Sequence, residues 1–170
     1  IDDHFSTTNI VNVQVGEQQA FYGSSFEIPG IIDAGDYDKF EGGIGQHISY
    51  YDASVINEGD YRTNEYVDAI TIPSEGNTVG WISAGEWLEY SIDVEDAGLY
   101  SLDIRYASGN DNGGGPIYFE IEGDTVSPEI TLPSTGSWTT WGNHLTNEIE
   151  LTQGEHILRL KVINGEFNLG

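Results

Sequence analysis

The sequence predicts an all-β fold, a β-sandwich or jelly roll built from two antiparallel sheets. Short runs of alternating or β-branched residues recur between Gly, Pro, Asn and Asp residues, which end strands and form turns. Almost no segment carries the 3.6-residue period and the capping residues of an amphipathic helix. Many short strands at this spacing are typical of sandwiches and jelly rolls. A chain of 170 residues is long enough for one such domain with its own core.

Each expected strand is a run of this kind, bounded by turn-forming residues. The run from Leu88, Leu-Glu-Tyr-Ser-Ile-Asp-Val, shows the alternation most clearly, since apolar and polar residues alternate along its whole length. In chain order the expected strands are Tyr66–Ile72, Leu88–Val94, Leu99–Tyr106, Ile117–Ile121, Glu129–Leu132, Glu148–Leu151 and His156–Ile163.

The first 27 residues can be read in two ways. Their Ser, Thr, Asn and Gln content favours a linker, whereas Ile10–Val15 alternates as a strand would. We therefore divide the chain into residues 1–27, a linker or an extra strand, and residues 28–170, the sandwich itself.

The charge of the chain excludes several partners. Twenty-nine Asp and Glu residues stand against five Lys and Arg, giving a formal net charge of -24. A phosphate backbone would be repelled, so we expect no nucleic acid. No apolar run approaches membrane-spanning length, so we expect no membrane partner. Because the chain has no cysteine, thiolate catalysis and cysteine-bound metals are excluded as well.

The most informative residues are Trp81 and Trp138, which lie in turn-forming sequence beside glycines. A tryptophan at the rim of a β domain forfeits burial energy unless a ligand, a partner or a loop covers the ring. The apolar C–H face of a sugar ring stacks well on such a ring. The pair therefore predicts carbohydrate binding.

Several blocks of this chain resemble the family 6 carbohydrate-binding modules. They follow the order of the family and extend over residues 28–170. The blocks are Ile28-Pro-Gly-Ile-Ile-Asp-Ala-Gly-Asp-Tyr-Asp, Asp60-Tyr-Arg with Val67-Asp68, Val79-Gly-Trp-Ile-Ser-Ala-Gly-Glu-Trp-Leu-Glu-Tyr, Gly98-Leu-Tyr with Arg105-Tyr-Ala-Ser-Gly, Pro133-Ser-Thr-Gly-Ser-Trp and Phe167-Asn-Leu.

The resemblance implies a non-catalytic β-sandwich, excised from a larger, secreted glycoside hydrolase and covalently linked to its catalytic domain in the parent protein. It implies an extracellular module that binds polysaccharide or oligosaccharide. In the family, two loop aromatics clasp a sugar and an asparagine bonds its hydroxyls. Carried over by motif, these residues are Trp81, Trp138 and Asn168. An asparagine side chain offers a donor and an acceptor to neighbouring hydroxyls.

A second family site lies on the concave face of one sheet. The resemblance places Trp87 and Glu120 there, and Tyr51, Tyr50 and Trp141 are further aromatics that could extend either site. Strand alternation puts Trp87 on the face opposite Leu88. Trp87 then either faces solvent or is covered by the N-terminal segment.

Many family members hold a structural calcium ion. Asp33 stands at the first ligand position, but Gly35 and Gly170 replace other oxygen ligands. Because calcium takes six or more oxygens, we expect a calcium site here to be doubtful. The acidic group around Asp52 and Asp60 is an alternative place for an ion.

Two other classes of function remain as alternatives. One is a catalytic glycosidase or lyase that uses paired carboxylates, although 29 acidic residues make such pairs unavoidable. The chain has no Gly-x-Ser-x-Gly motif and no close pair of histidines for zinc. The other is an adhesive structural sandwich, which would not need solvent-facing tryptophans.

Among glycans, we expect algal agarose or a β-1,3-glucan of the laminarin type.

Overall fold

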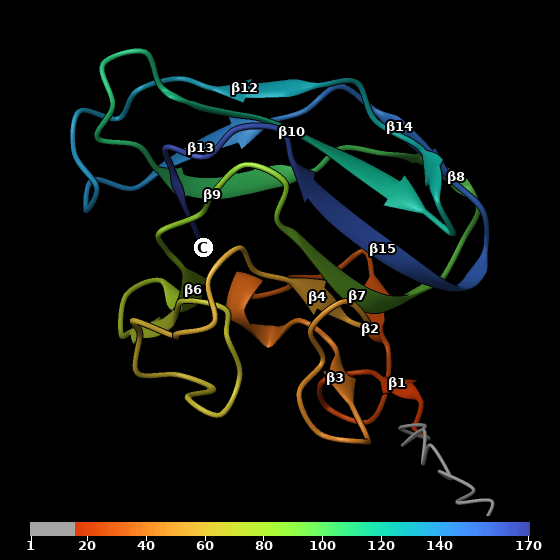
Figure 1. The fold of residues 1–170 in the computed structure, drawn as a ribbon. Coiled ribbons are helices and arrows are strands. Elements are labelled where there is room, and N and C mark those ends of the chain that lie inside the picture. The colour runs from red at the N-terminus through yellow and green to blue at the C-terminus, as the bar shows by residue number, and fades with distance from the viewer. Residues whose placement is uncertain (1–15) are drawn as a thin grey trace, which may run out of the picture.

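The computed structural model describes residues 16–170, and in them two main sheets face each other as a sandwich (Figure 1). The predicted fold class is confirmed. The seven-stranded sheet has the order β11 (Asp124–Thr125), β10 (Gly114–Ile121), β15 (Gly154–Val162), β7 (Trp87–Val94) and β2 (Phe26–Ile28), while β12 (Ile130–Leu132) also pairs with β10 and β4 (Tyr50–Tyr51) with β7. The five-stranded sheet has the order β13 (Gly142–Leu145), β9 (Asp103–Ala107), β16 (Asn168–Leu169), β6 (Gly76–Val79) and β5 (Ala69–Ile72).

Smaller elements complete the described part of the chain. β1 (Gln18–Gln19) pairs with β3 (Lys39–Phe40), and β8 (Gly98–Tyr100) pairs with β14 (Ile149–Leu151). A single 3₁₀ turn, η1 (Ala34–Asp36), precedes β3. No helix among residues 16–170 is long and apolar enough to cross a membrane.

The core lies between the sheets and follows the predicted alternation. In β7, Leu88, Tyr90, Ile92 and Val94 are buried. The antiparallel register of β7 with β15 sets Leu88 beside Leu160, so the inward side chains of both strands share the core. The alternate side chains of the same strands form the outer face of the seven-stranded sheet.

The sequence misplaced some strand boundaries. The run predicted as Leu99–Tyr106 is two strands, because the strand pairing is interrupted at Leu102, whose N–H donates to Thr146 Oγ1. Several strands of only two residues were not predicted, since two residues carry no period. The Ile10–Val15 strand remains a prediction, because it lies outside the described residues. Residues 18–19 and 26–28 do form strands.

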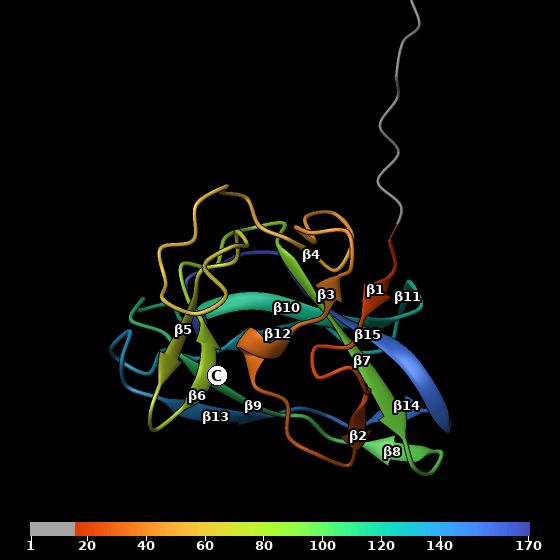
Figure 2. The ribbon, with the colours of Figure 1, turned by 90° about the horizontal axis from the view of Figure 1, so that it is seen from below.

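Figure 2, from below, shows long loops over one side of the sandwich, between β4 and β5 in particular. The turn between β6 and β7 and the loop between β12 and β13 carry the two tryptophans singled out by the sequence.

Candidate functional site

Trp81 and Trp138 are both solvent-facing. The Trp81 side chain is 57% exposed in the turn between β6 and β7, and Trp138 is 45% exposed in the loop between β12 and β13. Trp81 also has a φ of 48°, a left-handed conformation that side-chain-bearing residues rarely adopt. The two indoles make no ring contact with each other within residues 16–170. Neither ring is therefore a core side chain.

Asn168 brings the two tryptophan loops together. Its Nδ2 donates a hydrogen bond of 2.9 Å to the backbone oxygen of Trp138. Its Oδ1 lies 3.3 Å from the point where a Cβ on Gly80 would be, so it adjoins the residue before Trp81. The three residues that the resemblance pointed to thus converge at one end of the sandwich.

This contact modifies the role expected for Asn168. One N–H of the carboxamide is already committed to Trp138, so Oδ1 and the second N–H are the groups that the side chain can offer to a hydroxyl. Asn168 consequently fixes the position of Trp138 as well as facing the space beside it.

The backbone at Gly109 is in close contact with the indole ring of Trp138. A Cβ at Gly109 would lie 2.7 to 2.8 Å from three atoms of the indole, closer than atoms can approach. The ring therefore lies directly on the backbone at this position. The neighbouring Ser108 exchanges hydrogen bonds with Thr135, in which Ser108 N donates to Thr135 Oγ1 at 2.9 Å and Thr135 N donates to Ser108 O at 3.0 Å. These bonds anchor the loop that carries Trp138.

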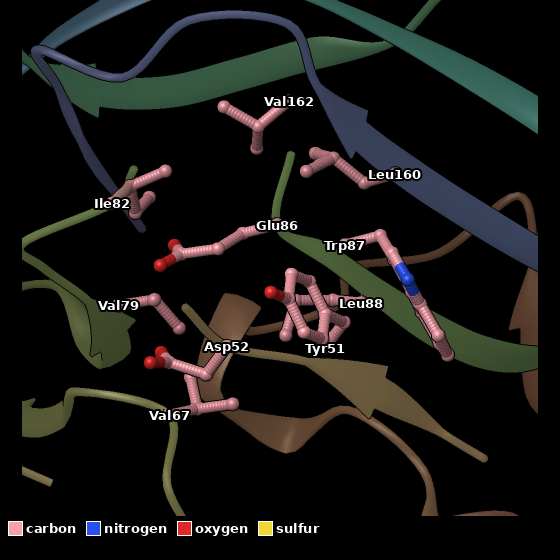
Figure 3. Close-up of a pocket in the computed structure, with 10 residues that line it drawn as sticks. All are labelled: Tyr51, Asp52, Val67, Val79, Ile82, Glu86, Trp87, Leu88, Leu160 and Val162. Carbon is pink, nitrogen blue, oxygen red and sulfur yellow. The ribbon is translucent and has the colours of Figure 1, made fainter. Parts of the chain in front are cut away.

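Glu86 anchors the turn that carries Trp81. Its carboxylate is buried and accepts two backbone hydrogen bonds, from Ser83 N at 2.9 Å and from Ala53 N at 3.1 Å. Figure 3 shows Glu86 and Asp52 in a small cavity lined otherwise by apolar side chains such as Val79 and Ile82, with Trp87 extending away from it. The sequence contained Glu86 inside a recognised block, but nothing in the pattern indicated that it ties two loops together.

Burial changes the acid–base behaviour of this cavity. It raises the pKa of Glu86 to about 7, and the two backbone hydrogen bonds offset only part of the effect. Burial likewise raises the pKa of Asp52 and of Asp68, each of which accepts one backbone N–H, from Ser54 and from Glu58 respectively. These carboxylates are committed to the protein's own backbone.

The second predicted site lies on the outer face of the seven-stranded sheet. The register sets Tyr51 beside Trp87, Trp87 beside Lys161 and Lys161 beside Tyr118. Trp87 is half-buried, and the guanidinium of Arg159 lies 4.3 Å from its ring centre. One face of this indole is therefore already covered from within the sheet.

The charges on this face are paired. Arg159 Nε donates to Glu89 Oε1 at 2.7 Å, and Arg159 Nη1 lies 3.8 Å from Glu120 Oε2. Lys161 Nζ lies 3.7 Å from the other oxygen of Glu120. The structure thus joins Trp87 and Glu120 through Arg159, which sequence reasoning did not single out.

The additional aromatics divide between core and surface. Tyr50 is fully buried against Tyr37, and its hydroxyl accepts a hydrogen bond from Tyr66 N, so the suggestion that it extends a site was wrong. Tyr51 is half-buried and stacks on His47, with 4.8 Å between ring centres. Trp141 is half-buried and lies against Gly170.

The residues around Asp33 fit a calcium ion poorly. Asp33 Oδ2 accepts the N–H of Asn77 at 3.1 Å, and Gly35 and Gly170 bring no side-chain oxygen. Asp36 is bonded to Tyr22, Tyr61 and Asn77. Within residues 16–170, no group of three or more acidic or histidine side chains is arranged to hold a metal, and this includes the acidic group around Asp52.

Comparison with known proteins finds a family model and several relatives that match part of this chain. The family described as "Carbohydrate binding module (family 6)" matches residues 58–170. The chain is 35% identical over 85 residues to endo-1,4-beta-xylanase B of Cellvibrio japonicus, covering 48% of this chain and 14% of that protein. The chain thus spans a small part of the curated relatives that it matches.

Two solved structures are similar in fold and sequence. A family 6 module from lichenase 5A of Cellvibrio mixtus, in complex with cellotriose, is 34% identical with a TM-score of 0.52, covering 60% of this chain and 79% of that one. The C-terminal family 6 module of a marine laminarinase from Zobellia galactanivorans is 30% identical with a TM-score of 0.55, covering 61% of this chain and 83% of that one.

Proposed function

Because this chain belongs to the family 6 carbohydrate-binding modules, we propose that it binds its glycan between the indoles of Trp81 and Trp138, with Asn168 bonding the sugar hydroxyls. The module is a non-catalytic, carbohydrate-binding β-sandwich. The observation that carries the proposal is that Asn168 lies between the loops of the two exposed tryptophans, since it donates to the backbone of Trp138 and adjoins Gly80. In such a site, one aromatic ring stacks on each face of a pyranose, and polar groups held in fixed positions bond the hydroxyls at the edge of the sugar.

The preferred ligand in this proposal is agarose or a β-1,3-glucan. A related module of known structure belongs to a marine laminarinase, and the formal net charge of -24 suits a salt-rich medium, where self-repulsion is screened. We also propose that the parent protein is a secreted glycoside hydrolase, which the module directs to its polysaccharide. The xylanase relative, in which this kind of segment is a small part of a longer chain, supports that arrangement.

Isothermal titration with laminarihexaose, neoagarohexaose, xylohexaose and cellohexaose tests the proposal. Trp81→Ala and Trp138→Ala should each weaken binding of the preferred sugar about a hundredfold, which corresponds to about 2.7 kcal/mol. Alanine keeps the Cβ at Trp81, so the backbone penalty at its positive φ is unchanged and the loss reports the ring.

Trp87→Ala is the matched control, since it removes the same side chain from the outer face of the sheet. Trp87→Ala should bind as the parent does, because Arg159 already covers one face of that ring. Loss of binding in Trp87→Ala with full binding in Trp81→Ala and Trp138→Ala would move the working site to the outer face.

A further inference from the structure

Glu166 is an exposed carboxylate two residues before Asn168. Phe167 and Leu169 are buried in the core, whereas Glu166 is exposed and Asn168 half-exposed. The Glu166 carboxylate accepts a hydrogen bond from Asn110, the residue after Gly109, against which the Trp138 ring packs. The side chain of Glu166 therefore lies near the loop of Trp138.

The backbone of Glu166 is held between the two tryptophan loops. A Cβ on the preceding Gly165 would lie 1.9 Å from the backbone oxygen of Ile82, so this segment lies directly against the turn of Trp81. On the other side, Ser108 Oγ donates to the backbone oxygen of Glu166 at 2.7 Å. Ser108 adjoins Gly109, on which the Trp138 ring rests.

The side chain of Glu166 is only partly used by the protein. Asn110 Nδ2 donates to Glu166 Oε2 at 3.1 Å, and Oε1 has no hydrogen-bond partner among residues 16–170. No lysine or arginine in the same range forms an ion pair with Glu166. Glu166 also has a φ of 71°, where glycine or asparagine is the usual residue.

We propose that Glu166 is a further ligand-binding residue of the Trp81–Trp138 site and that it makes the site select neutral over anionic glycans. The inference rests on the proposed function. Glu166 Oε1 accepts a hydrogen bond from a sugar hydroxyl, beside the Oδ1 of Asn168. A hydrogen bond to a charged acceptor is stronger than one to a neutral amide. A uronate or sulfate at the same place would meet an unpaired negative charge in a chain that is already strongly acidic.

Glu166→Gln tests the proposal, because it removes the charge and keeps the shape and a partner for Asn110. Glu122→Gln is the matched control. Glu122 is also an exposed glutamate at positive φ, 51°, and its Oε1 accepts one hydrogen bond of 3.1 Å, from Ile157 N, in the turn between β10 and β11. The probes are laminarihexaose and the same hexasaccharide with one glucose oxidised to glucuronate.

Titration of the parent should show tighter binding of the neutral probe. Glu166→Gln should bind the neutral probe several-fold more weakly and bring the two affinities together, while Glu122→Gln should match the parent. Parental affinities of Glu166→Gln for both probes, with binding lost in Trp81→Ala, would overturn the role of Glu166 and leave the tryptophan site intact. Full binding in Trp81→Ala and Trp138→Ala would overturn the tryptophan site and this inference with it.

Discussion

Replacing Glu86 by glutamine should flatten the dependence of stability on pH. Burial raises the pKa of Glu86 from 4.5 to about 7 in the folded protein. Because the folded carboxyl binds its proton more tightly than the unfolded one, the stabilisation is fully present below the unfolded pKa of 4.5. It is lost as the pH rises through the folded pKa. The parent should therefore lose stability between about pH 4.5 and pH 7 through this group.

The size of the effect follows from the two pKa values. Their difference corresponds to about 3 kcal/mol of unfolding free energy. Glutamine has no proton to lose, but it turns an NH₂ group towards either Ser83 N or Ala53 N, which both donate to the carboxylate. Leaving one of these donors unsatisfied costs about 1–3 kcal/mol at every pH. Glu86→Gln should thus be clearly less stable than the parent at pH 5, and the gap should close by pH 8.

Urea denaturation of the parent and of Glu86→Gln at pH 5, 6, 7 and 8 measures this difference. Glu150→Gln, on the exposed face of β14, controls for the general loss of one negative charge. A constant difference between the parent and Glu86→Gln across the pH range would refute the reasoning, since it would show that Glu86 does not change its protonation there.

Three further predictions follow from the site and its surroundings. Gly109→Ala should weaken binding of laminarihexaose about tenfold or more without changing the circular dichroism, because the new Cβ would displace the Trp138 ring; titration of a correctly folded variant with parental affinity would contradict this. Thermal melts in EDTA and in millimolar calcium should nearly coincide, because Asp33 is bonded to Asn77 and no group of three or more acidic side chains within residues 16–170 is arranged to hold a metal; a large upward shift with calcium would count against it. Prolonged incubation with the preferred glycan should release no new reducing ends, and steady release that survives repurification would reveal catalysis.

The sequence predicted the parts of this structure that depend on local pattern. The alternation from Leu88 defined β7, because strand period and burial act residue by residue. Exposure of Trp81 and Trp138 was predicted for a similar reason, since glycines beside them indicated turns. The short strands β4 and β16 were missed because their pairing is decided by distant strands.

The supporting residues of the site depend on tertiary contacts that no local pattern encodes. Gly109 matters because residue 138 lies on top of it, and Glu86 because it reaches both Ser83 and Ala53. Glu166 matters because its backbone lies between the two tryptophan loops, which are distant in sequence. A glutamate in a chain with 29 acidic residues does not stand out by composition.

The module has aromatic side chains on two surfaces, the outer face of the seven-stranded sheet and the loop end. The protein's own side chains cover the aromatic ring on the first surface more than on the second, and this difference favours the loop end as the binding site. On the outer sheet face, Trp87 is covered by Arg159, which is itself held by Glu89, so a sugar would have to displace a cation that is paired and stacked. At the loop end, Trp138 is fixed through its backbone and through Gly109, the turn of Trp81 is anchored by Glu86, and both rings remain exposed. A ring that is held in place but uncovered loses little conformational freedom on binding, and this raises affinity for the same contact area.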